Sequence, residues 1–193
     1  MPSELRSVQK ILKPRRLGTA PIYRILKKAE VHIYLAGPIS FAEDLQDYRR
    51  QLTEGLAKIS PKFKIHDPWE REQVAVHETK SELEMAGIEE KKAAAEDIIT
   101  KDLEDIASCD MVLAYMFRIG VGTSMEIFWC SRILGKPVIA VYQPAEEGAG
   151  PVPLWLLGHA NLVFQSKRGL YSWVRKALEE IDESEQEKPQ PQS

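Results

Sequence analysis

The sequence predicts a single α/β domain built on a doubly wound parallel sheet. Short segments that are apolar throughout alternate with longer segments in which apolar residues recur every three or four positions. Continuous apolar strands are typical of a sheet buried on both faces, and intervening helices make consecutive strands parallel. The chain has 193 residues, which is enough for one well-buried core and small for two.

Five short apolar runs are the predicted strands, and turn residues mark where the first two end. The first run, VHIYLA, stops at Gly37 and Pro38, and the second, FKIH, stops at Asp67 and Pro68. Ligands of doubly wound sheets bind beyond the carboxyl ends of the strands, so the loops after residues 36, 66 and 117 are candidate binding loops. The predicted strands span residues 31–36, 63–66, 111–117, 137–142 and 162–164.

Helical spacing of apolar residues predicts four main helices, at residues 45–59, 81–107, 123–134 and 169–181. The second of these is one long helix or a broken one. We expect three parts in the chain: a basic N-terminal extension at residues 1–29, the α/β domain at 30–182, and a flexible polar tail at 183–193. The tail is too polar to bury enough surface to become ordered alone.

The charge distribution argues against a nucleic-acid groove. Residues 1–30 hold eight Lys/Arg and two Asp/Glu, about +6, while the whole chain has a net charge of −3, which leaves the remainder near −9. Binding a nucleic-acid polymer requires clustered cations against the phosphates. A small-molecule substrate is therefore expected, and no nucleic-acid polymer.

Cysteine usage and hydropathy indicate a cytoplasmic protein without a metal site. The two cysteines, Cys109 and Cys130, lie in apolar segments and form no C-x-x-C pair, so neither a disulfide framework nor a zinc site is indicated. No apolar stretch has the length of a secretory signal or a membrane span. We expect no contact with a membrane.

A glycine-rich loop joins the most apolar predicted strand to a helix. It contains Gly120, Gly122, Thr123, Ser124 and Met125, and its glycines allow backbone N–H groups to approach an anion or a sugar. A dinucleotide-binding fingerprint is not favoured, because Met125 stands where a third glycine belongs and no acidic residue ends the next strand.

Glu126 follows this loop and has two interpretations. In one, Thr123 and Glu126 form a capping box, with the carboxylate bonded to its own helix terminus. In the other, the helix dipole favours the ionised carboxylate at a glycine-lined strand end, ready to act as a nucleophile.

Two further sets of residues are candidates for the site. Asp102 lies on the predicted helix just ahead of the same strand, where an acidic residue is either solvated surface or a second catalytic group. Pro68 and Trp69, beside His66 and Asp67, offer a stacking face and a polar edge for a base, or a packed core aromatic.

An ordered set of motifs resembles the nucleoside 2-deoxyribosyltransferase family. The set consists of IYLAGP at residues 33–38, the spacing of Asp102, Ile106, Cys109 and Asp110, GTSMEI at 122–127 and GKPV at 135–138. The resemblance covers about residues 31–165 and extends to the related deoxynucleoside 5′-monophosphate N-hydrolases. It implies a flavodoxin-like five-stranded parallel sheet and a homo-oligomer.

The resemblance also implies roles for individual residues. Glu126 attacks the anomeric carbon and forms a glycosyl ester, Asp102 helps the departing base take a proton, and Tyr34 lies near the nucleophile. No metal or organic cofactor is implied, and the partners are a nucleoside or nucleotide and a free nucleobase. The expected substrate-binding residues are Gly37, Pro38, Pro68, Trp69, Gly120, Gly122, Thr123, Ser124 and Met125.

The sequence departs from the family pattern at two positions. Transferases often carry an aspartate six residues before the nucleophile, where this chain has Gly120, and a neighbouring subunit usually offers an asparagine in the segment resembling 151–158, where Pro153 is the nearest match. A side chain without a donor cannot replace that contact. Both changes favour room for a 5′-phosphate.

Three functions follow as hypotheses. The first is base exchange between 2′-deoxynucleosides, and the second is N-glycosidic hydrolysis of nucleoside 5′-monophosphates. The third is a non-catalytic nucleotide-binding regulatory domain that uses the basic residues 1–29 to contact a partner.

Overall fold

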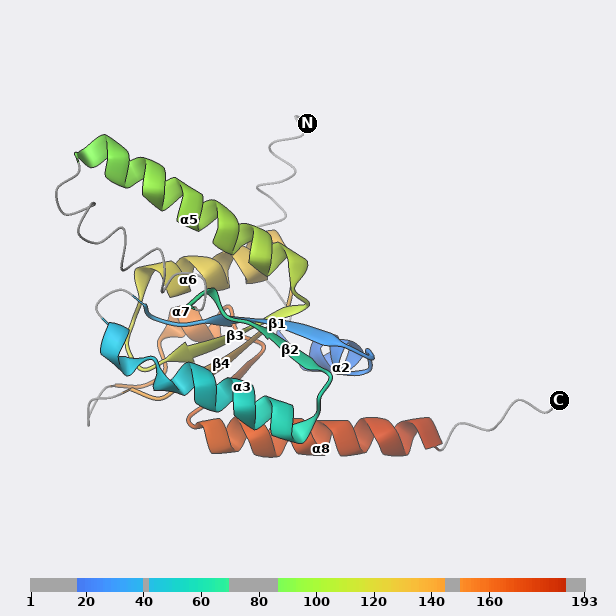
Figure 1. The fold of residues 1–193 in the computed structure, drawn as a ribbon. Helices are drawn as coiled ribbons and strands as arrows, with labels where there is room; N and C mark the ends of the chain where they lie inside the picture. The colour runs from blue at the N-terminus through green and yellow to red at the C-terminus, as the bar shows by residue number, and fades with distance from the viewer. Residues whose placement is uncertain (1–16, 40–41, 70–86, 145–149, 187–193) are drawn as a thin grey trace, which may run out of the picture.

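The computed structural model describes residues 17–39, 42–69, 87–144 and 150–186, and these contain one five-stranded, fully parallel sheet (Figure 1). The strand order is β2-β1-β3-β4-β5. This is the flavodoxin-like order of a doubly wound fold, so the predicted fold class is confirmed. The strands are β1 (Val31–Ala36), β2 (Phe63–His66), β3 (Met111–Met116), β4 (Val138–Tyr142) and β5 (Leu162–Phe164).

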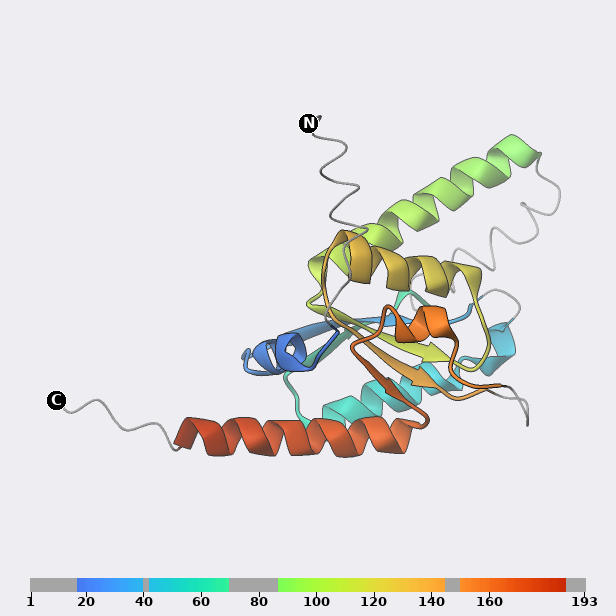
Figure 2. The same ribbon diagram turned by 180° about the vertical axis from the view of Figure 1, so that it is seen from behind.

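Helices cover both faces of the sheet (Figures 1 and 2). One face carries α2 (Ala20–Leu26), α3 (Asp47–Ile59) and α8 (Lys167–Gln186). The other carries α5 (Ile88–Ser108), α6 (Val121–Phe128) and α7 (Leu154–Leu157). Two shorter pieces complete the described elements: the 3₁₀ turn η1 (Glu43–Leu45) and the π-helix η2 (Trp129–Ile133), which directly follows α6.

The core has two layers because the central strands bury side chains on both faces. All six residues of β3 are buried, and alternate residues belong to different clusters. Leu113 packs with Leu52 of α3 and Val174 of α8 in one cluster. Val112 and Ala114 pack with Ile127 of α6 and its neighbours in the other. The continuous apolar pattern of this strand therefore reflects its central place in the sheet.

Helix boundaries differ from the predictions where loop residues join a helix. The predicted helix at 123–134 begins two residues earlier, at Val121, and gives way to the π-helix at Trp129. The predicted helix at 81–107 is described from Ile88 to Ser108, and residues 81–86 lie outside the described ranges. No described helix combines the length and the apolar character needed to cross a membrane.

The end segments contribute helices to the described structure. Within the basic segment 1–29, α2 buries Ile22 and Leu26 in the core, and the Tyr23 hydroxyl donates a hydrogen bond of 2.6 Å to Glu180 of α8. At the other end, α8 continues to Gln186, and the rest of the polar tail lies outside the described residues. The division into extension, domain and tail stays a prediction.

Candidate active site

The topological switch point of the sheet lies between β1 and β3, which are neighbours although they are not consecutive in the chain. Their carboxyl ends meet at one edge, and this is where doubly wound folds bind ligands. The loops that leave the two strands are in contact: a Cβ added at Gly120 would lie 3.4 Å from the Pro38 Cβ. The predicted binding loops after β1 and β3 are therefore neighbours.

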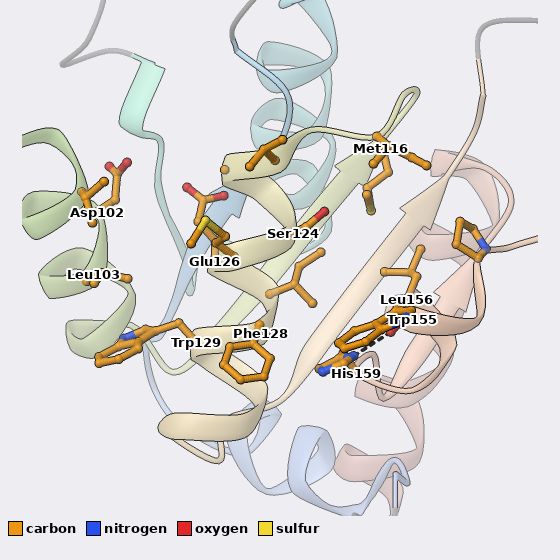
Figure 3. Close-up of a pocket in the computed structure, with 17 residues that line it drawn as sticks. Asp102, Leu103, Met116, Ser124, Glu126, Phe128, Trp129, Trp155, Leu156 and His159 are labelled. Carbon is orange, nitrogen blue, oxygen red and sulfur yellow. Dashed lines mark hydrogen bonds between the residues drawn. The ribbon is translucent and has the colours of Figure 1, made fainter. Parts of the chain in front are cut away.

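A cavity of about 810 Å³ adjoins this edge and is lined by parts of α5, α6 and α7 (Figure 3). Both predicted carboxylates, Asp102 and Glu126, line it, as do Gly122, Ser124 and Met125 of the glycine-rich segment. The rest of the lining is mainly apolar and aromatic, including Leu103, Met116, Phe128, Trp129, Trp155 and Leu156. An apolar cavity with a few polar groups is typical of a small-molecule site.

Glu126 is bonded to β1 rather than to its own helix terminus. The hydroxyl of Tyr34, a fully buried residue, donates a hydrogen bond of 2.7 Å to Oε1 of Glu126. The capping-box interpretation is wrong, because Gly120 is the N-cap and Thr123 is the third residue of α6. Glu126 lies in the second turn, beyond the first turn where the helix dipole acts most strongly. The tyrosine hydroxyl therefore orients this carboxylate.

Asp102 faces the interior because of its position on α5. It precedes Ile106, the buried residue of this otherwise largely exposed helix, by four positions and so shares its face. In Figure 3 the carboxylates of Asp102 and Glu126 are directed into the same gap between α5 and α6. The C-terminus of α5 is held by Lys136, whose ammonium group donates to the carbonyls of Ala107 at 2.5 Å and Cys109 at 2.6 Å.

The glycine-rich segment differs in detail from the expectation. Its residues from Val121 onward belong to α6, and the Ser124 hydroxyl donates to the Gly120 carbonyl at 2.8 Å. Thr123 is buried, and its Oγ1 lies beneath Gly120. Of this segment, Gly122, Ser124 and Met125 line the cavity, whereas Gly120 and Thr123 do not.

Gly37, Pro38, Pro68 and Trp69 do not line the cavity; they follow β1 and β2 at the same edge of the sheet. Asp67, beside them, accepts hydrogen bonds from Arg49 at 2.6 Å and from the Trp69 backbone N–H at 3.0 Å. The loop after β2 is thus bonded to Arg49, a buried residue of α3.

Sequence reasoning missed an aromatic cluster beside α6. The rings of Trp155 and His159 are stacked, with centroids 5.4 Å apart, and Nδ1 of His159 lies 2.6 Å from the Trp155 carbonyl oxygen. Phe128 packs against His159 at 5.9 Å (Figure 3). The spacing of four residues between Trp155 and His159 was the available signal. Among the described residues, no group of three or more His, Cys, Asp or Glu is arranged to hold a metal ion.

Comparisons with known proteins agree with the fold. The family model for nucleoside 2-deoxyribosyltransferase matches residues 33–168. A conserved protein from Enterococcus faecalis has a TM-score of 0.57 at 21% identity, covering 77% of this chain and 99% of that one. A 2-deoxyribosyltransferase from Bacillus psychrosaccharolyticus has a TM-score of 0.53 at 22% identity, covering 77% of this chain and 96% of its own. A search of curated proteins returned no match.

The fold and the family match define an N-glycosyltransferase-type enzyme that acts on the N-glycosidic bond of nucleosides. The chain belongs to the nucleoside 2-deoxyribosyltransferase family. The hypothesis of a non-catalytic regulatory domain is therefore set aside.

Proposed function

We propose that the protein exchanges bases between 2′-deoxynucleosides through a covalent intermediate on Glu126. One observation carries the proposal: a carboxylate oriented by a buried tyrosine hydroxyl lies in the same cavity as a second carboxyl group. Two carboxyl groups of this kind are what a retaining glycosidic mechanism requires.

In the first half-reaction, a Glu126 oxygen attacks C1′ of the sugar while the bond from C1′ to the base nitrogen breaks. The electron pair of that bond stays on the base, which takes a proton from the Asp102 carboxylic acid. In the second half, a nitrogen of an incoming base attacks C1′, the ester to Glu126 breaks, and the proton returns to Asp102. Tyr34 orients the nucleophile through its hydrogen bond.

The remaining predicted residues bind the substrate in this proposal. Gly37, Pro38, Pro68 and Trp69 lie outside the lining of the cavity, so the proposal places the substrate partly in the cavity and partly across the carboxyl edge of the sheet. There the loop of Gly37 and Pro38 borders the sugar, the loop of Pro68 and Trp69 borders the base, and the segment from Gly120 to Met125 approaches the 5′ end of the sugar. Neither a metal nor an organic cofactor takes part in these steps.

A second candidate is hydrolysis of nucleoside 5′-monophosphates, with water in place of the incoming base. The observation that favours it is Gly120, which offers no side chain to a 5′-hydroxyl and precedes the backbone N–H groups at the start of α6. Such groups bind phosphate well. Pro153 lines the cavity without a side-chain donor, which also suits a substrate other than a free nucleoside.

Product analysis distinguishes the two candidates. The protein is incubated with 2′-deoxyadenosine or its 5′-monophosphate, with and without free cytosine, and the products are separated by chromatography. Base exchange yields 2′-deoxycytidine from the nucleoside. Release of adenine from the monophosphate alone would overturn the transferase assignment in favour of hydrolysis.

Replacement of the nucleophile tests the covalent step. Glu126→Ala is expected to lose several orders of magnitude in kcat, and Glu104→Ala, which removes an exposed carboxylate on α5, should retain wild-type turnover. Mass spectrometry of the quenched wild-type reaction should detect a sugar adduct on the peptide that contains Glu126. Wild-type turnover by Glu126→Ala would refute the role of this residue.

We also propose that the chain assembles as a homo-oligomer through α6 and α7. Val121 of α6 is 79% exposed and Trp155 of α7 is 77% exposed, and Met125, Phe128 and Leu154 add further apolar surface around them. Apolar surface of this extent on adjoining elements is typical of an interface. Trp155→Lys should reduce the mass measured by sedimentation, whereas Leu45→Lys, at an exposed leucine of η1, should not.

A cytoplasmic location remains a prediction.

A further inference from the structure

Arg49 is a buried cation whose hydrogen bonds join three segments of the chain. It lies on α3, and its side chain is 2% exposed. Its Nη1 donates to the Leu35 carbonyl of β1 at 3.1 Å, and its Nη2 donates to the Gly37 carbonyl just beyond that strand at 3.0 Å. Its Nε donates to Gln46 at 2.6 Å. The guanidinium group of α3 is therefore hydrogen-bonded to the backbone at the carboxyl end of β1.

The same guanidinium reaches the loop after β2 through Asp67. Nη1 of Arg49 lies 2.6 Å from Oδ1 of Asp67, whose side chain is 10% exposed. This same oxygen accepts the backbone N–H of Trp69 at 3.0 Å. One carboxylate oxygen thus links the cation to the loop that carries Pro68 and Trp69. Gln46 extends the network on the other side, because its Nε2 donates to the Pro38 carbonyl at 3.0 Å.

We propose that Arg49 and Asp67 are positioning residues that fix the loops after β1 and β2 relative to each other, and so shape the substrate site without touching the substrate. The proposal rests on the function proposed above, in which these two loops border the sugar and the base. We refer to the pair as the Arg49–Asp67 clamp. Burying an ion pair stabilises a fold little in net terms, because desolvation opposes the attraction, so a role in geometry accounts for the pair better than a role in stability.

The geometry requires arginine specifically. The planar guanidinium carries five N–H donors, and the clamp engages acceptors in four directions: Leu35, Gly37, Gln46 and Asp67. A lysine ammonium group is a single point with three donors and cannot reach this set. Arg49→Lys, which keeps the charge, is therefore expected to fail as a replacement, whereas Asp67→Asn, which keeps an acceptor oxygen, is expected to retain much of the geometry.

The test combines a structural readout with kinetics. Amide hydrogen exchange and chemical shifts are measured by NMR at Gly37 and Ile39 in the wild type, Asp67→Ala, Asp67→Asn and Arg49→Lys. Asp67 belongs to the other loop, so faster exchange at these two amides in Asp67→Ala, by about tenfold or more, reports coupling through Arg49. Arg50→Ala is the matched control, since Arg50 is the next residue of α3 and its exposed side chain pairs only on the surface with Asp47 and Glu54.

The kinetic readout uses 2′-deoxyadenosine and its 5′-monophosphate. Asp67→Ala and Arg49→Lys are expected to raise KM about tenfold or more while kcat stays within about threefold, because the loops contribute binding rather than chemistry. Asp67→Asn and Arg50→Ala should stay close to the wild type. If Asp67→Ala does not fold, Arg49→Lys carries the same comparison.

The two proposals fail in different ways. Unchanged exchange at Gly37 and Ile39 in folded Asp67→Ala and Arg49→Lys would overturn the clamp and leave the proposed reaction intact. Equal loss of kcat and kcat/KM in these variants, with KM unchanged, would also overturn it, because the pair would then act on the reacting groups. Absence of turnover by the wild type with either substrate would overturn the proposed function, while the exchange measurement would still decide on the clamp.

Discussion

Gly37 occupies a position that no other residue fits, because the Tyr48 hydroxyl lies directly beneath it. A Cβ at Gly37 would lie 2.1 Å from Oη and 2.9 Å from Cζ of Tyr48, and 3.2 Å from the backbone carbonyl of Tyr115. Tyr48 cannot easily move away, since its ring stacks on that of Tyr115 with centroids 4.4 Å apart. The backbone at Gly37 therefore lies so close to the Tyr48 ring that no side chain fits between them.

Gly37→Ala is expected to lower the free energy of unfolding by about 1–3 kcal/mol, the usual cost of overpacking. Gly122→Ala is the comparison, because a Cβ there meets nothing within 4 Å and alanine favours the helix. Chemical denaturation of both variants measures the difference. Equal stability of the two would show that the loop moves freely away from Tyr48.

At the scale of single residues, two of the predicted site residues, Glu126 and Asp102, line one cavity, and their roles stay predictions. The sequence did not predict Arg49 or its partners. The two carboxylates flank one strand, so their proximity follows from local order along the chain. The partners of Arg49 come from the end of β1, the N-cap of α3 and the loop after β2, and helical spacing on α3 gives no information about the long-range contacts among these. Contacts of this kind depend on the packed tertiary structure.

At the scale of elements, the end of α5 depends on one lysine from a later loop. Lys136 donates to two carbonyls at the C-terminus of α5, and cations near a helix C-terminus are favourable. Lys136→Met should lower the free energy of unfolding by about 1–3 kcal/mol, since it leaves carbonyls without a charged donor. Because α5 carries Asp102, kcat should fall as well.

Lys176→Met provides the control for this prediction. Its ammonium group makes an exposed pair with Glu180 within α8, at 3.8 Å, and such pairs contribute little to stability. Thermal unfolding and initial rates of both variants make the comparison. A Lys136→Met protein as stable and as active as Lys176→Met would contradict the capping role.

Apolar periodicity predicted the existence and type of the strands and of the main helices, and it missed the form of α6. The helix starts at Val121 and changes to a π-helix at Trp129. Periodicity at 3.6 residues per turn does not distinguish an α-helix from an α-helix that ends in a wider turn. The shift matters, because it places Glu126 in the second turn, where the helix dipole acts less strongly, and there the carboxylate accepts a hydrogen bond from Tyr34.

At the scale of the whole molecule, Asp110 ties the N-terminal segment to the central sheet. It accepts hydrogen bonds from the Lys28 ammonium at 2.6 Å and from the His32 backbone N–H at 2.9 Å. Burial alone would raise the pKa of Asp110, but these two donors outweigh it, and the pKa lies below its usual value. The contribution to stability is therefore present above about pH 4, near the unfolded pKa, and is lost as the pH falls through the lower folded pKa.

Asp110→Asn is expected to be less stable than the wild type at pH 7, and the difference should shrink as the pH falls below about 4. Asp44→Asn, at an exposed position, should show no such difference. Urea denaturation at pH 7, 5 and 3 measures it. A difference that stays constant over this range would show that the charge of Asp110 does not matter.

The separation between Asp102 and Glu126 along the chain is short, and the residues proposed to border the base lie elsewhere. A single contiguous stretch that runs down α5, along β3 and into α6 contains both carboxylates, whereas the loops after β1 and β2 belong to earlier parts of the chain. The two carboxylates can therefore be inherited together with this stretch, with Tyr34 of β1 as the one group of the proposed mechanism that comes from outside it, while the loops after β1 and β2 change independently. Grafting those two loops from a relative with a different base preference, together with its own clamp, should transfer the preference while bond cleavage remains the same.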